Sequence, residues 1–314
     1  MTRSTARALC FGEGLVVLVP TAPGPLEDAT TFGRSIGGAE VNVAIALAGL
    51  GVPSDVVTRV GDDGFGRHLT AELARHGVGT EAVETDPHRP TGLYVKEVGG
   101  TTGAPTDLGP GASRMHYYRA GSAMSAATPH LLETPAARRA LSGATLIHTT
   151  GITPGLSAGA AAAQTALAAG RRPGQLLAFD LNWRPALWRK HSSPSDVLAG
   201  FVRSADIVLL GASEASAVFG LDDPAALRRE FPHPRWLVVK NDGEPVTAFD
   251  GSAHVHAPTS RVEVVEPIGA GDAFAAGLLS GIVGGRPLDD ALAVAHRIAA
   301  RALTSSADHV GAAL

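Results

Sequence analysis

The chain has 314 residues, of which 45% are hydrophobic, so it is long enough for one large α/β domain or two modest ones. A net charge of −4 gives no reason to expect a basic surface for nucleic acid, and the single Cys10 excludes an intrachain disulfide. No apolar run reaches the roughly 18 residues of a membrane span, and no signal-peptide pattern is present. We therefore expect a soluble, cytoplasmic protein that binds neither nucleic acid nor a membrane.

The first part of the chain mixes strand-like and helix-like segments with turns rich in glycine, proline and threonine. A Gly-Glu-Gly break interrupts the first apolar stretch, ALCFGEGLVVLVP. The segment GGAEVNVAIALAGLG has apolar residues at helical spacing and ends in Gly51, which favours termination of a helix. We expect strands over 8–20, 54–61, 92–98 and 113–121, short β segments over 21–36, and helices over 37–51 and 66–78.

The remainder of the chain alternates short apolar strands with helices, which predicts an α/β fold with a central, mostly parallel sheet flanked by helices. We expect helices near 129–142, 157–170, 194–203, 213–230, 270–284 and 287–304, and strands over ATLIHTTG, 175–182, 205–211, 235–241, 245–249, 253–257 and 261–265. The β segments at about 14–36 and 90–121 interrupt this rhythm, and we expect them to form a small β lid. No linker is evident, so residues 1–314 are expected to form a single domain.

The stretch EPIGAGDAFAAGLLSGI at 266–282 places one acid, Asp272, behind a glycine turn and before an apolar helix. One interpretation is an N-cap, because aspartate satisfies free N–H groups at a helix start. The other is a catalytic base beside an anion site, because glycines let backbone N–H groups converge on a phosphate. In sheets of this kind, ligands bind outside the carboxyl ends of the strands, where this segment is expected.

Three glycine motifs occur in register along the chain: GGAEVNVAIALAGLG, GDDGFG at 61–66, and GAGDAFAAG. In this order and spacing they resemble the ribokinase-like (phosphofructokinase-B type) carbohydrate kinases over nearly the whole chain. The resemblance implies a central β-sheet flanked by helices, a β lid over the sugar, and transfer of phosphate from ATP and Mg²⁺ to a hydroxyl group. The stretches FGEGLVVLVP, PTGLYVKE, HYYRAGSAMS, GITPGLS and FDLNWRPALW are most similar to the 2-keto-3-deoxygluconate kinases of that family.

Asp272 matches the catalytic base of the family, which accepts the proton of the attacking sugar hydroxyl. The resemblance implies that the backbone N–H groups of Gly269, Ala270 and Gly271 face the charge that builds up on the transferred phosphoryl group. The same residue can still start a helix, so the capping role is not excluded at this point.

The substrate side of the site is expected to combine a sugar-binding helix start with a carboxylate clamp. Gly37, Gly38 and Asn42 are either sugar contacts or helix packing, and an Asn within VNVA needs a partner such as a sugar hydroxyl. An arginine fork matches a carboxylate, which a sugar acid has and a neutral sugar lacks. The alternative is surface arginines and lid-filling tyrosines; the resemblance assigns the substrate to Tyr94, Tyr117, Arg119 and Arg184.

Three further residues have roles outside this clamp or several possible roles. Tyr118 alternates to the other face of its strand and is expected to pack. Glu13 contacts either the substrate or a local hydrogen-bond partner. Asp180 could steer Arg184, contact a Mg²⁺-bound water or cap a turn, and the sequence does not separate these alternatives.

The nucleotide side departs from the family pattern. Lys240, Asp242 and Gly243 stand where many relatives have a glycine loop under the nucleotide, and Gly269 and Gly271 are expected to join them in binding ATP. The family's Asn-x-x-Glu motif, linked to the metal, has become Gly-Ala-Ser-Glu, so Glu214 is expected to act on Mg²⁺ only indirectly.

The resulting hypothesis is ATP-dependent phosphorylation of the terminal hydroxyl of 2-keto-3-deoxygluconate, giving 2-keto-3-deoxy-6-phosphogluconate. One alternative is a kinase of a neutral sugar such as fructose or ribose. An alternative of another class is a sugar-acid sensor that has lost turnover. Members of the family often pair through their lids, so a homo-oligomer is expected by resemblance.

Overall fold

The computed structural model describes residues 6–241, 243–259, 262 and 268–304. Among them, nine strands form one sheet in the order β13-β12-β11-β10-β9-β8-β1-β4-β5. β11, β12 and β13 pair antiparallel and the other neighbours pair parallel. The strands are β1 (Ala8–Phe11), β4 (Ser54–Gly61), β5 (Val83–Asp86), β8 (Leu146–Thr150), β9 (Leu176–Asp180), β10 (Ile207–Gly211), β11 (Trp236–Asn241), β12 (Glu244–Asp250) and β13 (Ala253–Ala257).

Helices cover both faces of this sheet, and each face has its own apolar layer. In β9, Ala178 belongs to one layer while Leu177 and Phe179 belong to the other, because successive side chains of a strand point to opposite faces. One layer includes α1 (Ala39–Gly49), α2 (Gly64–Arg75), α10 (Ala270–Val283) and α11 (Leu288–Leu303). The other includes η3 (Pro129–Glu133), α3 (Pro135–Gly143), α5 (Ala158–Ala169), α7 (Pro194–Ser204), α8 (Ala212–Phe219) and α9 (Pro224–Glu230). Short helices connect the rest: η1 (Leu26–Asp28), η2 (Met124–Ala126), α4 (Thr153–Leu156) and α6 (Pro185–Trp188).

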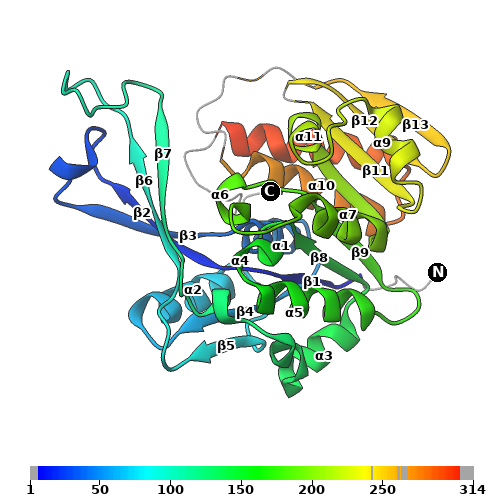
Figure 1. Ribbon diagram of the computed structural model, residues 1–314, viewed down its shortest axis with the longest axis horizontal. Coiled ribbons are helices and arrows are strands. Elements are labelled where there is room, and N and C mark those ends of the chain that lie inside the picture. The colour runs from blue at the N-terminus through cyan, green and yellow to red at the C-terminus, as the bar shows by residue number, and fades with distance from the viewer. Residues whose placement is uncertain (1–5, 242, 260–261, 263–267, 305–314) are drawn as a thin grey trace.

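A separate four-stranded sheet stands beside the main one, in the order β3-β2-β6-β7 (Figure 1). β2 and β6 pair parallel, and the two outer pairs are antiparallel. The predicted fold class, a mostly parallel helix-flanked sheet with a small additional sheet, is confirmed. The closing of this sheet over a sugar and the division of the chain into a single domain stay predictions. Its strands are β2 (Leu15–Pro20), β3 (Phe32–Gly37), β6 (Leu93–Val98) and β7 (Ser113–Tyr118).

The structure differs from the sequence-based expectations in several respects. The stretch 8–20 is two strands in different sheets, because the Gly-Glu-Gly break lets the chain leave one sheet and enter the other. β5 was not predicted, since its sequence VETD carries no apolar alternation. Tyr118 does not pack, because 62% of its surface is exposed. The strand predicted at 261–265 lies outside the described residues apart from Val262, which is in no strand.

Candidate active site

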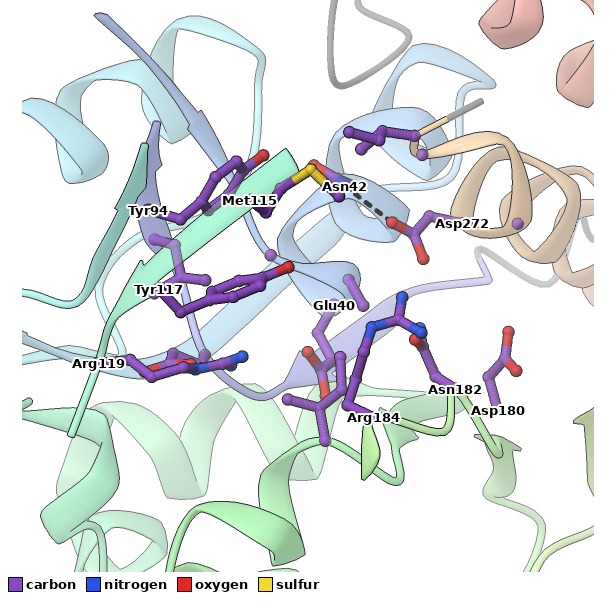
Figure 2. A pocket seen from close by; sticks show the side chains of 18 of the residues that line it. Glu40, Asn42, Tyr94, Met115, Tyr117, Arg119, Asp180, Asn182, Arg184 and Asp272 are labelled. Carbon is purple, nitrogen blue, oxygen red and sulfur yellow. Dashed lines mark hydrogen bonds and ion pairs between the residues drawn. The ribbon is translucent and has the colours of Figure 1, made fainter. Parts of the chain in front are cut away.

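A cavity of about 490 Å³ lies between the small sheet and the carboxyl-end loops of the main sheet (Figure 2). The small sheet contributes Tyr94, Met115 and Tyr117, while the opposite wall comes from the segments after β9 and before α10. The cavity therefore joins segments that are far apart in sequence. It is lined by Glu13, Leu15, Gly38, Ala39, Glu40, Asn42, Tyr94, Met115, Tyr117, Arg119, Ile152, Asp180, Asn182, Arg184, Glu214, Lys240, Ile268, Gly269, Gly271 and Asp272.

The glycine turn before α10 determines where Asp272 stands. Gly269 is the N-cap residue and has φ 79°, a left-handed conformation that favours glycine. Ala270 and Gly271 open the helix, and Asp272 follows as its third residue without capping it through a side-chain hydrogen bond. The capping interpretation of Asp272 is therefore wrong: the turn is capped by a glycine, and the carboxylate faces the cavity instead.

Asp272 forms a hydrogen bond with a residue of α1, which also begins after a glycine, Gly38. Asn42, on α1, donates a hydrogen bond from Nδ2 to Asp272 Oδ2 over 2.8 Å (Figure 2). Burial raises the pKa of Asp272 to about 6, against the lowering effect of this hydrogen bond. The partner of Asn42 is thus a carboxylate rather than the sugar hydroxyl that the sequence suggested. The Asn42 Oδ1 atom is buried without a partner among the described residues, so it remains an acceptor at the cavity wall.

The two glycines before α1 have different positions. Gly38 lines the cavity with φ 120°, and a Cβ there would lie 2.1 Å from the Glu13 carbonyl oxygen. Gly37 is not among the lining residues. A Cβ on Gly37 would lie 3.1 Å from Val17 Cγ2 and 3.2 Å from the Tyr94 hydroxyl, so this glycine gives room to the tyrosine behind the wall. Gly37 therefore lies behind the cavity wall and not at the surface that a sugar would contact.

The four residues predicted to clamp a carboxylate all line the same cavity. The rings of Tyr94 and Tyr117 have their centroids 5.3 Å apart, and the Arg119 guanidinium lies 5.1 Å from the Tyr117 ring centroid. However, Arg119 forms a buried ion pair with Glu13. Arg119 is therefore not an open half of a clamp, which corrects the expectation from sequence. Its Nε atom has no partner among the described residues.

Arg184 differs from Arg119 because it has no carboxylate in ion-pair contact within the described residues. Its guanidinium donates one hydrogen bond, from Nη1 to the carbonyl oxygen of Trp183 at 3.0 Å. Figure 2 shows the side chain extending into the cavity on the side of Asp272. Its positive charge lowers the pKa of Asp272, as a secondary effect to burial. Arg184 is thus the cation available to an acidic ligand.

Two acids and a lysine lie where β9, β10 and β11 end. Lys240 Nζ lies 3.1 Å from Asp180 Oδ2, so Asp180 forms an ion pair that the sequence did not indicate. Its three possible roles drawn from sequence stay predictions. Burial alone would lower the pKa of Lys240, but Asp180 and Glu214 outweigh it and raise that pKa. A Cβ on Gly271 would lie 3.9 Å from Lys240 Nζ, which places this cation beside the glycine turn.

The remaining nucleotide-side predictions have mixed outcomes. Glu214 lines the cavity, but its two oxygens accept hydrogen bonds from the amides of Gly211 and Trp183. Gly243 has φ 89° in the turn between β11 and β12 and is not among the lining residues. Asp242 lies outside the described residues. Within the described part of the chain, no group of three or more His, Cys, Asp or Glu side chains is arranged to hold a metal ion.

Among the polar lining residues, sequence reasoning missed two, Glu40 and Asn182. Glu40 is 1% exposed, and its Oε1 atom accepts hydrogen bonds from the hydroxyls of Thr150 (2.7 Å) and Thr153 (3.2 Å). Burial raises the pKa of Glu40 to about 7. Asn182 is the one non-glycine residue of the described chain with a positive φ, at 40°. The signal for Glu40 was an acid inside an otherwise apolar helix, which is costly unless it has partners.

A second cavity, of about 760 Å³, lies between the end of β13 and α11, where it is lined by residues that include Val255, Pro258 and Ala300. Ile298 and Ala302 of α11 pack against Ala273 and Ala270 at the start of α10. Residues 268–272 are not among the residues that line this second cavity.

The whole chain can be compared with known proteins. Residues 5–310 match the model of the pfkB family carbohydrate kinases. The chain belongs to this family. The predicted family and enzyme class, an ATP-dependent carbohydrate kinase, are confirmed. Among the described residues, no helix is both long and apolar enough to span a membrane.

Individual relatives of this kinase are named for different substrates. It is 32% identical to a 2-dehydro-3-deoxygluconokinase of Thermoproteus tenax, over 91% of this chain and 86% of that protein. It is 31% identical to fructokinase-1 of Zea mays, over 87% and 82%. Among solved structures, a PfkB protein from Polaromonas sp. JS666 has a TM-score of 0.82 and 30% identity, with 96% of each chain covered. These similarities do not separate sugar acids from neutral sugars.

Proposed function

We propose that this kinase phosphorylates the terminal hydroxyl of 2-keto-3-deoxygluconate to give 2-keto-3-deoxy-6-phosphogluconate. One observation carries the proposal: Arg184, a cation without a carboxylate in ion-pair contact among the described residues, lines the same cavity as Asp272. A ligand with a carboxylate at one end and a hydroxyl at the other would meet both. Tyr94, Tyr117 and Arg119 would form the wall along the small sheet.

In this proposal Asp272 accepts the proton of the terminal hydroxyl. The hydroxyl oxygen forms the new bond to the γ-phosphorus of ATP while the bond from that phosphorus to the β,γ-bridging oxygen breaks, and ADP leaves with the electron pair. Because the pKa of Asp272 is raised only to about 6, the carboxylate is largely ionised at neutral pH and can act as the base. Asn42 occupies one carboxylate oxygen and leaves the other for the hydroxyl.

The phosphoryl group would lie at the start of α10. Backbone N–H groups of Gly269, Ala270 and Gly271 at a helix N-terminus, with Lys240 beside Gly271, supply positive potential to an anion there. The second cavity, between β13 and α11, offers a partly apolar wall for a nucleobase. Mg²⁺ supplies charge neutralisation on the phosphates, and we expect the phosphates to carry it because Asp180 and Glu214 already have partners.

A neutral sugar is the alternative substrate, and one observation favours it. Glu13 already matches the charge of Arg119, so the cavity holds one uncommitted arginine rather than two. A non-catalytic sensor would need no oriented base, whereas here Asn42 fixes Asp272 at the glycine turn. We therefore propose a catalytic role for the chain, and the experiment below distinguishes between the two classes of substrate.

Pairing of two chains through the small sheet is part of the same proposal. Its support is the exposure of large apolar side chains on that sheet, with Phe32 41% and Tyr118 62% exposed. Sedimentation equilibrium of the full chain and of a Phe32→Ser, Tyr118→Ser variant tests it. A mass of one chain for both proteins contradicts pairing.

The deciding experiment measures ADP release by the purified kinase with ATP and Mg²⁺. The substrates are 2-keto-3-deoxygluconate, 2-keto-3-deoxygalactonate, fructose and ribose. Release with the acids alone supports the proposal, and the relative kcat/KM of the two acids identifies the preferred epimer. Release with fructose or ribose alone moves the assignment to a neutral-sugar kinase. Binding of an acid by calorimetry without any ADP release supports the sensor.

A further inference from the structure

Glu214 stands at the cavity wall, but its carboxylate faces two backbone amides. Oε1 accepts from Trp183 N and Oε2 accepts from Gly211 N, each over 3.0 Å. The second bond is within its own helix start, where Glu214 caps α8. The first bond reaches 31 residues back along the chain, to the loop that follows β9. Glu214 therefore ties two neighbouring strand ends together at the floor of the site.

Both backbone polar groups of Trp183, which belong to two successive peptide units, are hydrogen-bonded. Its N–H is bound by Glu214, and the carbonyl oxygen of the same residue accepts from Arg184 Nη1 at 3.0 Å. Arg184 is thus oriented by a residue whose own backbone is held by Glu214. Burial raises the pKa of Glu214, and the charge of Arg184 acts against this rise as one of the smaller effects, so the guanidinium lies close enough to act on this carboxylate.

The loop that carries Arg184 has an unfavourable backbone conformation that needs such support. Asn182 has φ 40°, in the left-handed region, and it is 8% exposed. A non-glycine residue in this region persists where surrounding contacts fix it. On the other side Arg184 precedes Pro185, the first residue of α6, so its backbone is the N-cap of that helix. The Glu214 bond to Trp183 N lies between these two constraints.

We infer that Glu214 is a positioning residue for substrate recognition, which holds the Trp183 peptide so that the Arg184 guanidinium meets the carboxylate of a sugar acid. This inference rests on the proposed function. It assigns Glu214 a role in orienting Arg184 toward the substrate, in place of the indirect metal role suggested by the sequence. Glu214 itself need touch neither the sugar nor a metal ion.

A double-mutant cycle tests the inference on the full chain. The variants are Glu214→Ala, Arg184→Ala and the double variant, with Glu230→Ala as a matched control because Glu230 forms an exposed ion pair with Arg203. Glu214→Gln is added because an amide keeps one acceptor oxygen and preserves folding if the alanine variant fails. The readouts are KM for 2-keto-3-deoxygluconate, KM for ATP, kcat and the Mg²⁺ concentration at half-maximal rate.

We expect Glu214→Ala to raise the KM for the sugar acid by about tenfold, with Glu214→Gln between it and the unsubstituted protein. The KM for ATP and the Mg²⁺ half-saturation should stay within about twofold. The double variant should match Arg184→Ala within about twofold, because a residue that acts through Arg184 has no effect once Arg184 is absent.

Two other outcomes are separable. In the first, Arg184→Ala raises the KM for the sugar acid, but the double variant raises it by the product of the two single effects, or Glu214→Ala changes the Mg²⁺ half-saturation instead. The positioning role is then overturned, and the proposed substrate stands. In the second, Arg184→Ala leaves the KM for the sugar acid unchanged. Arg184 then does not bind the substrate carboxylate, so both the proposed function and the positioning role of Glu214 are rejected.

Discussion

Asn42 and Asp272 are 230 residues apart, and the 2.8 Å hydrogen bond between them joins the starts of α1 and α10. Both helices begin at a glycine with positive φ, 120° at Gly38 and 79° at Gly269. Each glycine turn therefore places its helix close to the cavity, and the Asn42 amide orients the carboxylate. The relationship makes Asp272 and Asn42 a functional unit rather than two independent ligand contacts.

Replacing Asp272 with Asn should lower kcat by about 10²- to 10⁴-fold, the usual contribution of a general base, while sugar affinity changes little. Steady-state kinetics and calorimetric binding of the sugar measure the two effects separately. Asp290→Asn is the control, because Asp290 is an exposed acid in the first turn of α11. A kcat within a few-fold of the unsubstituted protein would rule out the assignment of the base.

The activity should fall as the pH drops through about 6, because Asp272 must be ionised to accept a proton and its pKa is raised to about 6. The Asn42 hydrogen bond lowers that pKa, so Asn42→Ala should raise it further and move the acidic limb of the kcat profile to higher pH. The measurement is kcat between pH 5 and 8 at saturating substrate. An unmoved limb would show that Asn42 does not tune the base.

The two arginines should respond differently to substitution. Arg184→Ala should raise the KM for a sugar acid and leave the melting temperature nearly unchanged, since Arg184 is exposed. Arg119→Ala leaves the buried Glu13 without its partner, so we expect it to destabilise the fold by about 3–5 kcal/mol. The combination Glu13→Gln with Arg119→Gln should recover much of that stability. Equal stability losses for both single variants would contradict this division of roles.

Glu40 should make the fold less stable as the pH rises. Burial raises its pKa from 4.5 to about 7, so the folded state binds more protons than the unfolded state between these values. The free energy of unfolding should therefore decrease across that window, by about 3 kcal/mol from this group. In Glu40→Gln this decrease should be absent. Urea unfolding at pH 5 and pH 8 measures it, with Glu81→Gln as the exposed control; parallel pH dependence in all three proteins would refute the assignment.

Gly38 should tolerate no side chain. Its φ is 120°, and a Cβ would lie 2.1 Å from the Glu13 carbonyl oxygen, so Gly38→Ala should destabilise the fold by at least about 1–3 kcal/mol and disturb the cavity. At Gly33, on β3, the nearest atom to an added Cβ is 3.8 Å away, so Gly33→Ala is the matched control. Thermal unfolding of the two variants compares them directly, and similar melting temperatures would contradict the prediction.

The sequence predicted which segments meet at the site more fully than it predicted how their side chains pair. The glycine motifs and the strand–helix alternation indicated the sheet edge at which Asp272 lies, because local patterns specify strand ends and helix starts. The family resemblance added Asn42, Arg119 and Arg184, and all four residues line one cavity. The pairing of Arg119 with Glu13 across 106 residues depends on how the small sheet is placed against β1. That arrangement follows from strand order, which no local pattern encodes.

The same limit applies to the ion pair of Lys240 with Asp180. These residues belong to β11 and β9, which are separated by β10 in the sheet, so their contact follows only from the strand order. Gly243 shows a related limit, and its contact with the nucleotide stays a prediction. A glycine-rich turn suggests phosphate binding, but this one serves the β11–β12 hairpin with φ 89°.

The parallel pairing of β9, β10 and β11 also makes the charged cluster a check on strand register. Leu209 pairs with both Asp180 and Val238, and Gly211 pairs with Lys240, so Asp180 and Lys240 lie on the same face of the sheet, two residues apart along the strands. A slip by one residue in either outer strand would turn Asp180 or Lys240 toward the opposite apolar layer, since strand side chains alternate between faces. An unpaired charge buried there would cost several kcal/mol. Wrong strand registers are therefore disfavoured by the same side chains that form the floor of the site. A catalytically active molecule is thus one in which these strands are correctly paired.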